Sequence, residues 1–421
     1  MNNFSRSGLA GLLAAVISVT AAQAETKSPR ISGEVSFELQ DDWTYKSDDR
    51  GNLNNHLFAT VEPSVTFAIA PGWSVFAHAV LEPSGSPAKF ENRMFEDTAL
   101  YLADFYVEFA EGRFGAKAGK LNPGFGVAWD MAPGVYGSDL AEDYEISERI
   151  GVVGSWQVGA GRYGDHTVSG STFFADTSIF SESALRSRGD LREGDGGLSN
   201  TESFRSFVVA LNGENIPGAG KLGYHLSYMK QAAGAGNTAD EKAFAAALYT
   251  SFGLGGGVAF NPLVEGVRII DQGGTAGVDR TYLTVAGQLE WQNWNLAASV
   301  TERETNNVTT ANDTDTHMQI SAGYTFDFGL SIDVGWKISE DAGTETRTLG
   351  AVAAYTNMTE NTFNTAESNK EEIIARSSVV APAVLALLFG AFLVLGTGFA
   401  HSDTIHNAAH DTRHSFAFPC H

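Results

Sequence analysis

The chain has 421 residues and is acidic, with 27 lysines and arginines against 50 aspartates and glutamates and a formal net charge of −23. This balance argues against nucleic acid or anionic lipid headgroups as binding partners. A single cysteine excludes an internal disulfide framework. The 46 glycines, the 11% aromatic residues and the 11 prolines are typical of many strands joined by tight turns.

Residues 1–24 have the layout of a secretory signal peptide. Arg6 precedes an apolar stretch from Leu9 to Val19, and small residues lead to a predicted cleavage site after Ala24. The alternative is a membrane anchor, but the apolar stretch is short for a helix that crosses a bilayer. We therefore predict that the chain is exported to the cell envelope.

Residues 25–356 consist of segments in which apolar and polar residues alternate, the pattern of strands with two different faces. In "YLTVAGQLEW", residues 282–291, Leu283 and Val285 face away from Thr284. Aromatic residues close the apolar faces near the strand ends, as the girdle of a membrane barrel requires. The predicted strands lie near 31–40, 56–68, 73–82, 101–109, 113–121, 149–158, 165–176, 204–212, 221–231, 243–252, 256–268, 280–291, 294–304, 316–325, 329–338 and 347–356.

The connections distinguish a membrane barrel from a soluble β-sandwich or propeller, which also alternates. Tight turns such as "APGW" and "AEGR" alternate with longer loops along the chain. Short turns at one end and long loops at the other are typical of outer-membrane barrels. An even strand number also leaves no unpaired edge in the bilayer. We predict an all-β transmembrane barrel of about sixteen antiparallel strands in the outer membrane, in contact with membrane lipid.

The loop "NPGFGVAWDMAPGVYGSDLAEDYEISE", residues 122–148, is the third of the predicted outer loops. This organisation resembles the sixteen-stranded general porins of Gram-negative outer membranes, in which the third loop folds into the lumen. The resemblance implies a channel for small solutes or ions, a homotrimer, and a constriction lined by Asp130, Asp139, Glu142, Asp143, Glu145 and Glu148. Carboxylates in such a place favour cations. The alternative is an acidic, solvated loop outside the pore.

No enzymatic signature stands out in the barrel segment. A barrel hydrolase needs a Ser/His pair, and the segment holds only five scattered histidines. We expect no catalysis.

The alternating pattern ends after Tyr355, and the composition of the sequence changes. Residues 357–376 read as a polar linker, and residues 377–400 carry no charge. At 1.5 Å per residue the uncharged run is long enough for a transmembrane α-helix, and Pro382 lies in its first turns, where a helix tolerates proline best. The alternative is a buried core helix.

The tail, residues 401–421, holds five of the ten histidines and the only cysteine. If the helix continues, residues 403, 406, 410 and 414 form one stripe, and imidazoles four residues apart can chelate one divalent ion. The spacing predicts a site for a late divalent metal such as cobalt, nickel, copper or zinc without naming it. The alternative is a polar cap on the helix end. The candidate ligands are His401, Asp403, His406, His410, Asp411, His414, Cys420 and His421.

With the helix before it, the tail "GFAHSDTIHNAAHDTRHSFAFPCH" resembles the CbtB family over residues 358–421. Members of this family are small single-helix subunits of a proposed cobalt transporter. The resemblance implies cobalt as the transported ion, a larger polytopic CbtA-like subunit in the membrane, and a histidine tail that hands over the ion. No permanently bound cofactor is implied.

The two parts conflict in location. A run as apolar as residues 379–399 is expected to stop in the inner membrane during export. The linker reaches about 70 Å at most when fully extended, which is short for the distance between two membranes. A chain that began at Met358 would form a plausible complete subunit. We therefore favour two joined reading frames with separable products over the rival hypothesis, a true fusion that couples outer entry to inner uptake.

Overall fold

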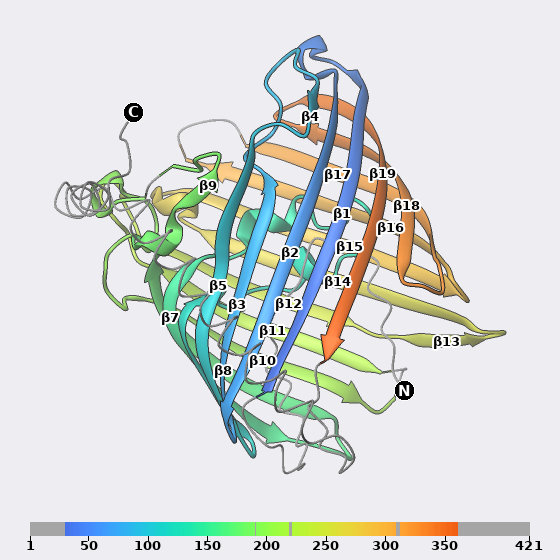
Figure 1. The fold of residues 1–421 in the computed structure, drawn as a ribbon. Coiled ribbons are helices and arrows are strands. Elements are labelled where there is room, and N and C mark those ends of the chain that lie inside the picture. Colours follow the sequence, from blue (N-terminus) through green and yellow to red (C-terminus); the bar gives the residue numbers. More distant parts are fainter. Residues whose placement is uncertain (1–29, 190, 219–220, 309–311, 361–421) are drawn as a thin grey trace, which may run out of the picture. The chain divides into compact units, whose positions relative to one another are not determined.

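The computed structural model describes residues 30–360, apart from residues 190, 219–220 and 309–311. These residues form one 19-stranded sheet that closes into a barrel (Figure 1). The strands are β1 Arg30–Ser47, β2 Asn54–Ala70, β3 Trp73–Pro83, β4 Arg93–Met94, β5 Thr98–Glu111, β6 Phe114–Leu121, β7 Arg149–Gly159, β8 Asp165–Ala175, β9 Ser183–Leu185, β10 Ser206–Ile216, β11 Leu222–Gln231, β12 Glu241–Tyr249, β13 Phe252–Gly255, β14 Val258–Ile270, β15 Val278–Trp291, β16 Trp294–Asn307, β17 Asp313–Thr325, β18 Leu330–Asp341 and β19 Thr344–Glu360. The short helices are η1 Arg50–Asn52, α1 Ala128–Met131, η2 Ala141–Tyr144, η3 Ile179–Ser181, η4 Glu193–Asp195 and η5 Gln272–Gly274.

Seventeen of the nineteen strands form the barrel wall, and because two of them are parts of one interrupted strand, the wall has sixteen strands, which confirms the predicted number. Strands β4 and β9 belong to loops, where β9 pairs with the upper part of β5. Strands β12 and β13 both pair with β14 and act as one interrupted wall strand. Neighbouring wall strands are antiparallel, and β19 pairs with β1 from Thr346 to Glu360. The wall is therefore closed, and no strand leaves its backbone N–H and C=O groups unpaired at an edge inside the bilayer.

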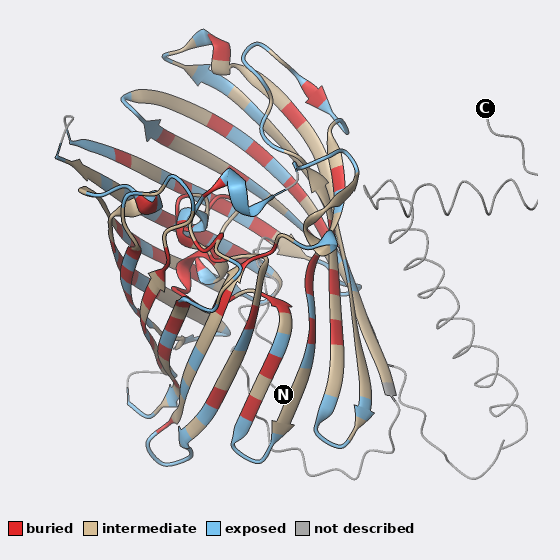
Figure 2. Ribbon diagram, turned by 90° about the vertical axis from the view of Figure 1, so that its left-hand side faces the viewer, coloured by how far each residue is buried: buried red, intermediate tan, exposed pale blue. Residues whose placement is uncertain are grey.

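The two faces of the wall differ as the alternation predicted. Along β15, Leu283 is 51% exposed and Val285 48% exposed, whereas Thr284 between them is fully buried. Figure 2 shows the same alternation of buried and exposed residues along many strands. The outward side chains are apolar and are suited to lipid, and the inward ones are mostly polar.

Aromatic rings follow the barrel at the end with the short turns. Trp73, Phe109, Phe114 and Trp156 form a chain of ring contacts across β3, β5, β6 and β7, with centroids 4.8–6.3 Å apart. A second chain joins Trp294 to Tyr324. Such rings have one apolar and one polar side and suit the boundary between lipid and water, as predicted for the girdle.

The strands are longer than predicted at the loop end. The predicted loop 339–346 is only a turn at residues 342–343, because β18 continues to Asp341 and β19 begins at Thr344. The alternation of side chains ends where the apolar band ends, but backbone hydrogen bonds continue the ladder into water.

The predicted helix at residues 377–400 lies outside the described residues; among those described, no helix is long and apolar enough to cross a membrane.

Candidate functional site

The loop between β6 and β7, residues 122–148, folds into the barrel, as predicted for the third outer loop. We call this segment the inner loop. It makes hydrogen bonds to inward-facing side chains of β1, β11, β14, β15, β16, β17 and β18. One loop can contact strands so far apart around the ring only from inside, where Figure 1 shows its short helices. The inner loop therefore narrows the lumen.

The apolar side of the inner loop packs on one half of the wall. There β12 presents Ala243, Ala245 and Ala247 to the lumen, so the loop can approach the backbone closely. Burial of these apolar groups is the main force that holds the loop against the wall. The buried cluster comprises Phe125, Val127, Ala128, Trp129, Ala132, Ala141, Tyr144 and Ile146 of the loop, and Phe173, Val208, Met229, Ala243, Ala245, Ala247, Leu263, Val267, Ile269, Tyr282 and Ala286 of the wall.

Glu265 of β14 fastens the start of the inner loop. Its carboxylate accepts hydrogen bonds from the backbone amides of Val127, at 2.6 Å, and Ala128, at 2.9 Å, and from the Tyr144 hydroxyl. Only 1% of Glu265 is exposed. The two amides begin the single turn of α1 and have no partner within a helix, so the carboxylate satisfies donors that would otherwise be buried unpaired.

Gly126, beside this anchor, has φ +69°, and a Cβ there would lie 2.8 Å from the Tyr144 ring. Only glycine combines that backbone conformation with so close an approach. Its amide donates to Nε2 of His225 at 3.2 Å. Glycine at position 126 is therefore a requirement of how the loop enters the lumen.

Three of the six predicted acidic residues are paired with cations of the wall. Asp139 accepts from Lys337 at 2.6 Å, and Asp143 accepts from Arg303 at 2.6 Å. Glu148 lies 2.8 Å from the Lys120 ammonium. These ion pairs hold the loop to β18, β16 and β6.

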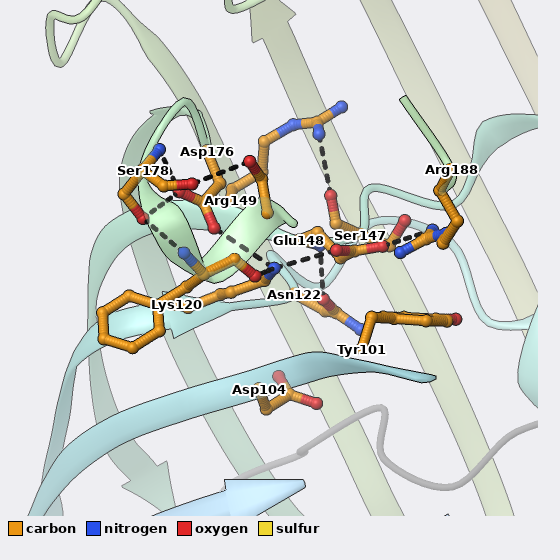
Figure 3. A network of polar contacts seen from close by, with 12 residues as sticks. Tyr101, Asp104, Lys120, Asn122, Ser147, Glu148, Arg149, Asp176, Ser178 and Arg188 are labelled. Carbon is orange, nitrogen blue, oxygen red and sulfur yellow. Dashed lines mark hydrogen bonds and ion pairs between the residues drawn. The ribbon is translucent and has the colours of Figure 1, made fainter. Parts of the chain in front are cut away.

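The pairing of Glu148 belongs to the network in Figure 3. The buried Lys120 ammonium also lies 3.1 Å from Asp176 and donates to the Phe180 carbonyl at 2.7 Å. Arg188 donates to Glu148 at 2.6 Å. Burial acts to raise the pKa of Glu148, but Arg188 and Lys120 outweigh it and hold that pKa below its ordinary value.

Arg188 also lies over the Tyr101 ring, 3.5 Å from its centroid. The backbone amide of Glu148 donates to the Asn122 side chain at 2.8 Å, which joins the two ends of the inner loop. Through Asp176 and Arg188 the network ties the inner loop to the long loop between β8 and β10. That long loop also supplies β9 to the upper edge of β5.

Glu142 and Glu145 form no ion pair with any residue that the structure describes. Both carboxyls touch the lumen, yet the surrounding protein limits the water that can solvate their charges. This burial, with the negative charge of Asp139, raises the pKa of Glu142 to about 7. Burial, with the charges of Glu142 and Asp130, raises the pKa of Glu145 to about 7.

The wall near these two carboxyls also carries acidic residues. The charge of Glu82 on β3 acts on Glu142, and that of Asp104 on β5 acts on Glu145. Asp130 lies half-buried in α1. Carboxyls of β3 and β5 therefore lie near enough to those of the inner loop for their charges to repel one another.

The sequence prediction did not include the partners of the loop. Glu265, Arg303 and Lys337 hold the loop, and Glu82 and Asp104 face it, but all five lie on strands. One signal was available for Glu265, the lone carboxyl in "PLVEGVRII", where Arg268 is the only other charged residue. The partner of each loop residue was not predictable without the register of the closed barrel.

The predicted metal ligands, from His401 to His421, lie outside the described residues. Within residues 30–360, where the structure describes them, no group of three or more His, Cys, Asp or Glu side chains is arranged to hold a metal ion.

The comparisons with known proteins fall into two parts that match the two parts of the chain. Residues 372–421 match the model of the family described as "Probable cobalt transporter subunit (CbtB)". No curated protein sequence matches the chain.

Solved structures match the barrel. Pseudomonas putida OprB has a TM-score of 0.55 and 9% identity, covering 78% of this chain and 94% of its own. The outer membrane channel DcaP of Acinetobacter baumannii has a TM-score of 0.53 and 12% identity, covering 78% and 96%. A loop-deletion mutant of OmpT from Vibrio cholerae has a TM-score of 0.52 and 8% identity, covering 78% and 99%. The chain thus combines a sixteen-stranded barrel with the fold of outer-membrane porins and a carboxyl-terminal segment similar to CbtB.

Proposed function

We propose that the predicted barrel, residues 25–356, forms an outer-membrane channel that admits small solutes and ions and favours cations. The observation that supports this most directly is the inner loop, which crosses the lumen and brings acidic side chains together there. A membrane anchor without transport would need no such loop. The test is the conductance of the full chain in planar lipid bilayers, with the reversal potential under a KCl gradient as the measure of selectivity.

The six acidic residues of the inner loop have two roles in this proposal. Asp130, Glu142 and Glu145 line the narrow part of the channel and attract cations. Asp139, Asp143 and Glu148 mainly hold the loop through their ion pairs. Neutralising Glu142 and Glu145 is then expected to reduce the preference for potassium over chloride without widening the pore.

For the carboxyl-terminal part we propose a CbtB-like role in cobalt transport. The match over residues 372–421 and the density of histidines support this proposal. The tail would bind a late divalent metal through the predicted ligands and pass it to a CbtA-like polytopic subunit. Titration of the full chain with cobalt, nickel and zinc tests the site, with and without His406→Ala and His410→Ala. If the parent and the variants bind all three metals equally and weakly, the tail has no specific site and acts only as a metal buffer.

The two parts are proposed to reach different membranes, the barrel the outer one and the helix the inner one. Two separable products explain this most simply, and a true fusion is the alternative. An epitope tag after His421 distinguishes them. A small tagged product in inner membranes supports separate products, whereas a single full-length product contradicts them.

We also propose that the barrel forms a homotrimer, as the resemblance to general porins implies. Cross-linking in native outer membranes, followed by electrophoresis without heating, tests this assembly.

A further inference from the structure

A second set of carboxyls lies on the wall, apart from the inner loop. On β1, Glu34, Glu38 and Asp42 recur every fourth residue, on the face opposite the outward Val35 and Phe37. They therefore all face the lumen, because side chains alternate along a strand.

Carboxyls from two other strands lie at the levels between these three: one from β2, which pairs with β1, and one from β18, which is separated from β1 by β19. Glu62 of β2 pairs with Ser36, which places it between the levels of Glu34 and Glu38. Asp333 of β18 is level with Val352, which pairs with Gln40, so Asp333 lies between the levels of Glu38 and Asp42. We call Glu34, Glu62, Glu38, Asp333 and Asp42 the carboxylate ladder.

The levels of the carboxylate ladder are evenly spaced along the strands, two residues or about 6.7 Å apart. Sideways, Glu62 lies one strand from β1, about 4.8 Å, and Asp333 lies two strands from β1 on the other side, about 9.6 Å, because β19 runs between β1 and β18. The upper end meets the inner loop, because Asp42 accepts a hydrogen bond from Tyr136 at 2.6 Å. The ladder therefore continues from the constriction along one side of the lumen.

Glu38, at the middle of the ladder, lacks any compensating partner. Only 9% of the residue is exposed, and its carboxylate has no hydrogen bond or ion pair with the residues that the structure describes. The charged groups that act on it are Glu62, Asp42 and Asp333, all of them acidic. A buried carboxylate in such surroundings is unfavourable unless a proton or an external cation neutralises it.

The nearby basic side chains of the wall are already engaged. His78, which acts on Glu62, lies 3.2 Å from Asp104. Lys337, which acts on Asp42, lies 2.6 Å from Asp139. The ladder therefore keeps an excess of negative charge for a cation that enters the lumen.

We propose that the carboxylate ladder binds linear organic cations that carry more than one ammonium group, with Glu38 as the central contact. This inference rests on the proposed channel function and names a substrate class for it. The carboxyls are too widely spaced to chelate one bare metal ion, in agreement with the absence of a three-ligand group among the described residues. Ammonium groups separated by a short alkyl chain can contact successive levels, each through charge-assisted hydrogen bonds.

The experiment measures block of the potassium current through the full chain in planar bilayers by 1,4-diaminobutane and, for comparison, by butylamine. The diamine is expected to block at lower concentration than the monoamine. Glu38→Gln is expected to raise the half-blocking concentration of the diamine about tenfold, the scale of one hydrogen bond to a charged group. Glu38→Asp, which keeps the charge, is expected to have a smaller effect. Glu302→Gln, on the outer face of β16, is the matched control and is expected to leave the block unchanged.

Equal block of parent and Glu38→Gln channels would overturn the inference, since it would mean that a proton neutralises Glu38. Equal block by diamine and monoamine would also overturn it, because the ladder would then act only as a diffuse negative field. If Glu38→Gln does not fold, as judged by its electrophoretic mobility before and after heating, Glu62→Gln provides the same comparison. A parent chain without any conductance would instead refute the proposed channel function.

Discussion

Removal of the Glu265 carboxylate is expected to release the inner loop. Glu265→Ala leaves the amides of Val127 and Ala128 buried without an acceptor. Each such loss costs about 1–3 kcal/mol, so the two amides together cost on the order of 2–6 kcal/mol of loop docking. The Tyr144 hydroxyl loses its acceptor as well. The barrel itself should remain, because its ladder of backbone hydrogen bonds does not depend on this side chain.

Single-channel recording is the assay for this prediction. A loop that leaves the lumen part of the time should give a larger and noisier conductance and a weaker preference for cations. Hydrogen exchange of residues 125–129 should become faster, while exchange in β15 stays slow. Glu302→Ala on the outer face is the control. If Glu265→Ala retains the parent conductance and slow exchange in the loop, the apolar packing alone holds the loop and the reasoning about the anchor is refuted.

Three further predictions concern charge and the lipid face. Because the pKa values of Glu142 and Glu145 are raised to about 7, cation selectivity should rise as the pH increases through that value. Docking of the loop should weaken as the pH rises toward and through the same value, because the Glu142 and Glu145 carboxyls ionise less readily in the folded chain than in the unfolded one. The double variant Glu142→Gln with Glu145→Gln should abolish both effects. Reversal potentials measure the selectivity and hydrogen exchange measures the docking, both between pH 5 and pH 9. Lys120→Met leaves the buried Asp176 carboxylate without its ion pair, while Glu148 keeps Arg188, and should cost about 3–5 kcal/mol, seen as a lower temperature of heat-induced mobility change; a midpoint equal to that of the parent would contradict a structural role. Val285→Arg, on the lipid face, should destabilise the barrel by about 2–4 kcal/mol in urea titrations in lipid vesicles, and no change would argue against a bilayer around β15.

Much of the barrel wall was predictable because each strand is marked by the alternation of apolar and polar residues that are close together in the sequence. The alternation in residues 282–291 identified both faces of β15, and similar stretches located all sixteen wall strands. Strand ends were less predictable, as in the turn at residues 342–343, because backbone pairing extends beyond the alternating pattern. The inward position of residues 122–148 followed from the order of turns and loops together with the resemblance to porins.

The electrostatics of the lumen was not predictable in the same way. Asp139 and Lys337 are 198 residues apart and meet only because the barrel closes. The sequence shows six similar carboxyls in the inner loop, whereas three are ion-paired with the wall and two titrate near neutral pH. A charge acts through distance and burial, and both are properties of the folded chain.

The sequence alone determined the architecture of the barrel, since side-chain alternation and turn length are read directly from neighbouring residues. It also identified the separate character of the histidine-rich carboxyl terminus, through composition and motif. Only the tertiary structure decided which carboxyls anchor the inner loop, which face the lumen unpaired, and how β1, β2 and β18 assemble the carboxylate ladder. The physical reason is that strand register and ring closure bring together residues that no local pattern relates.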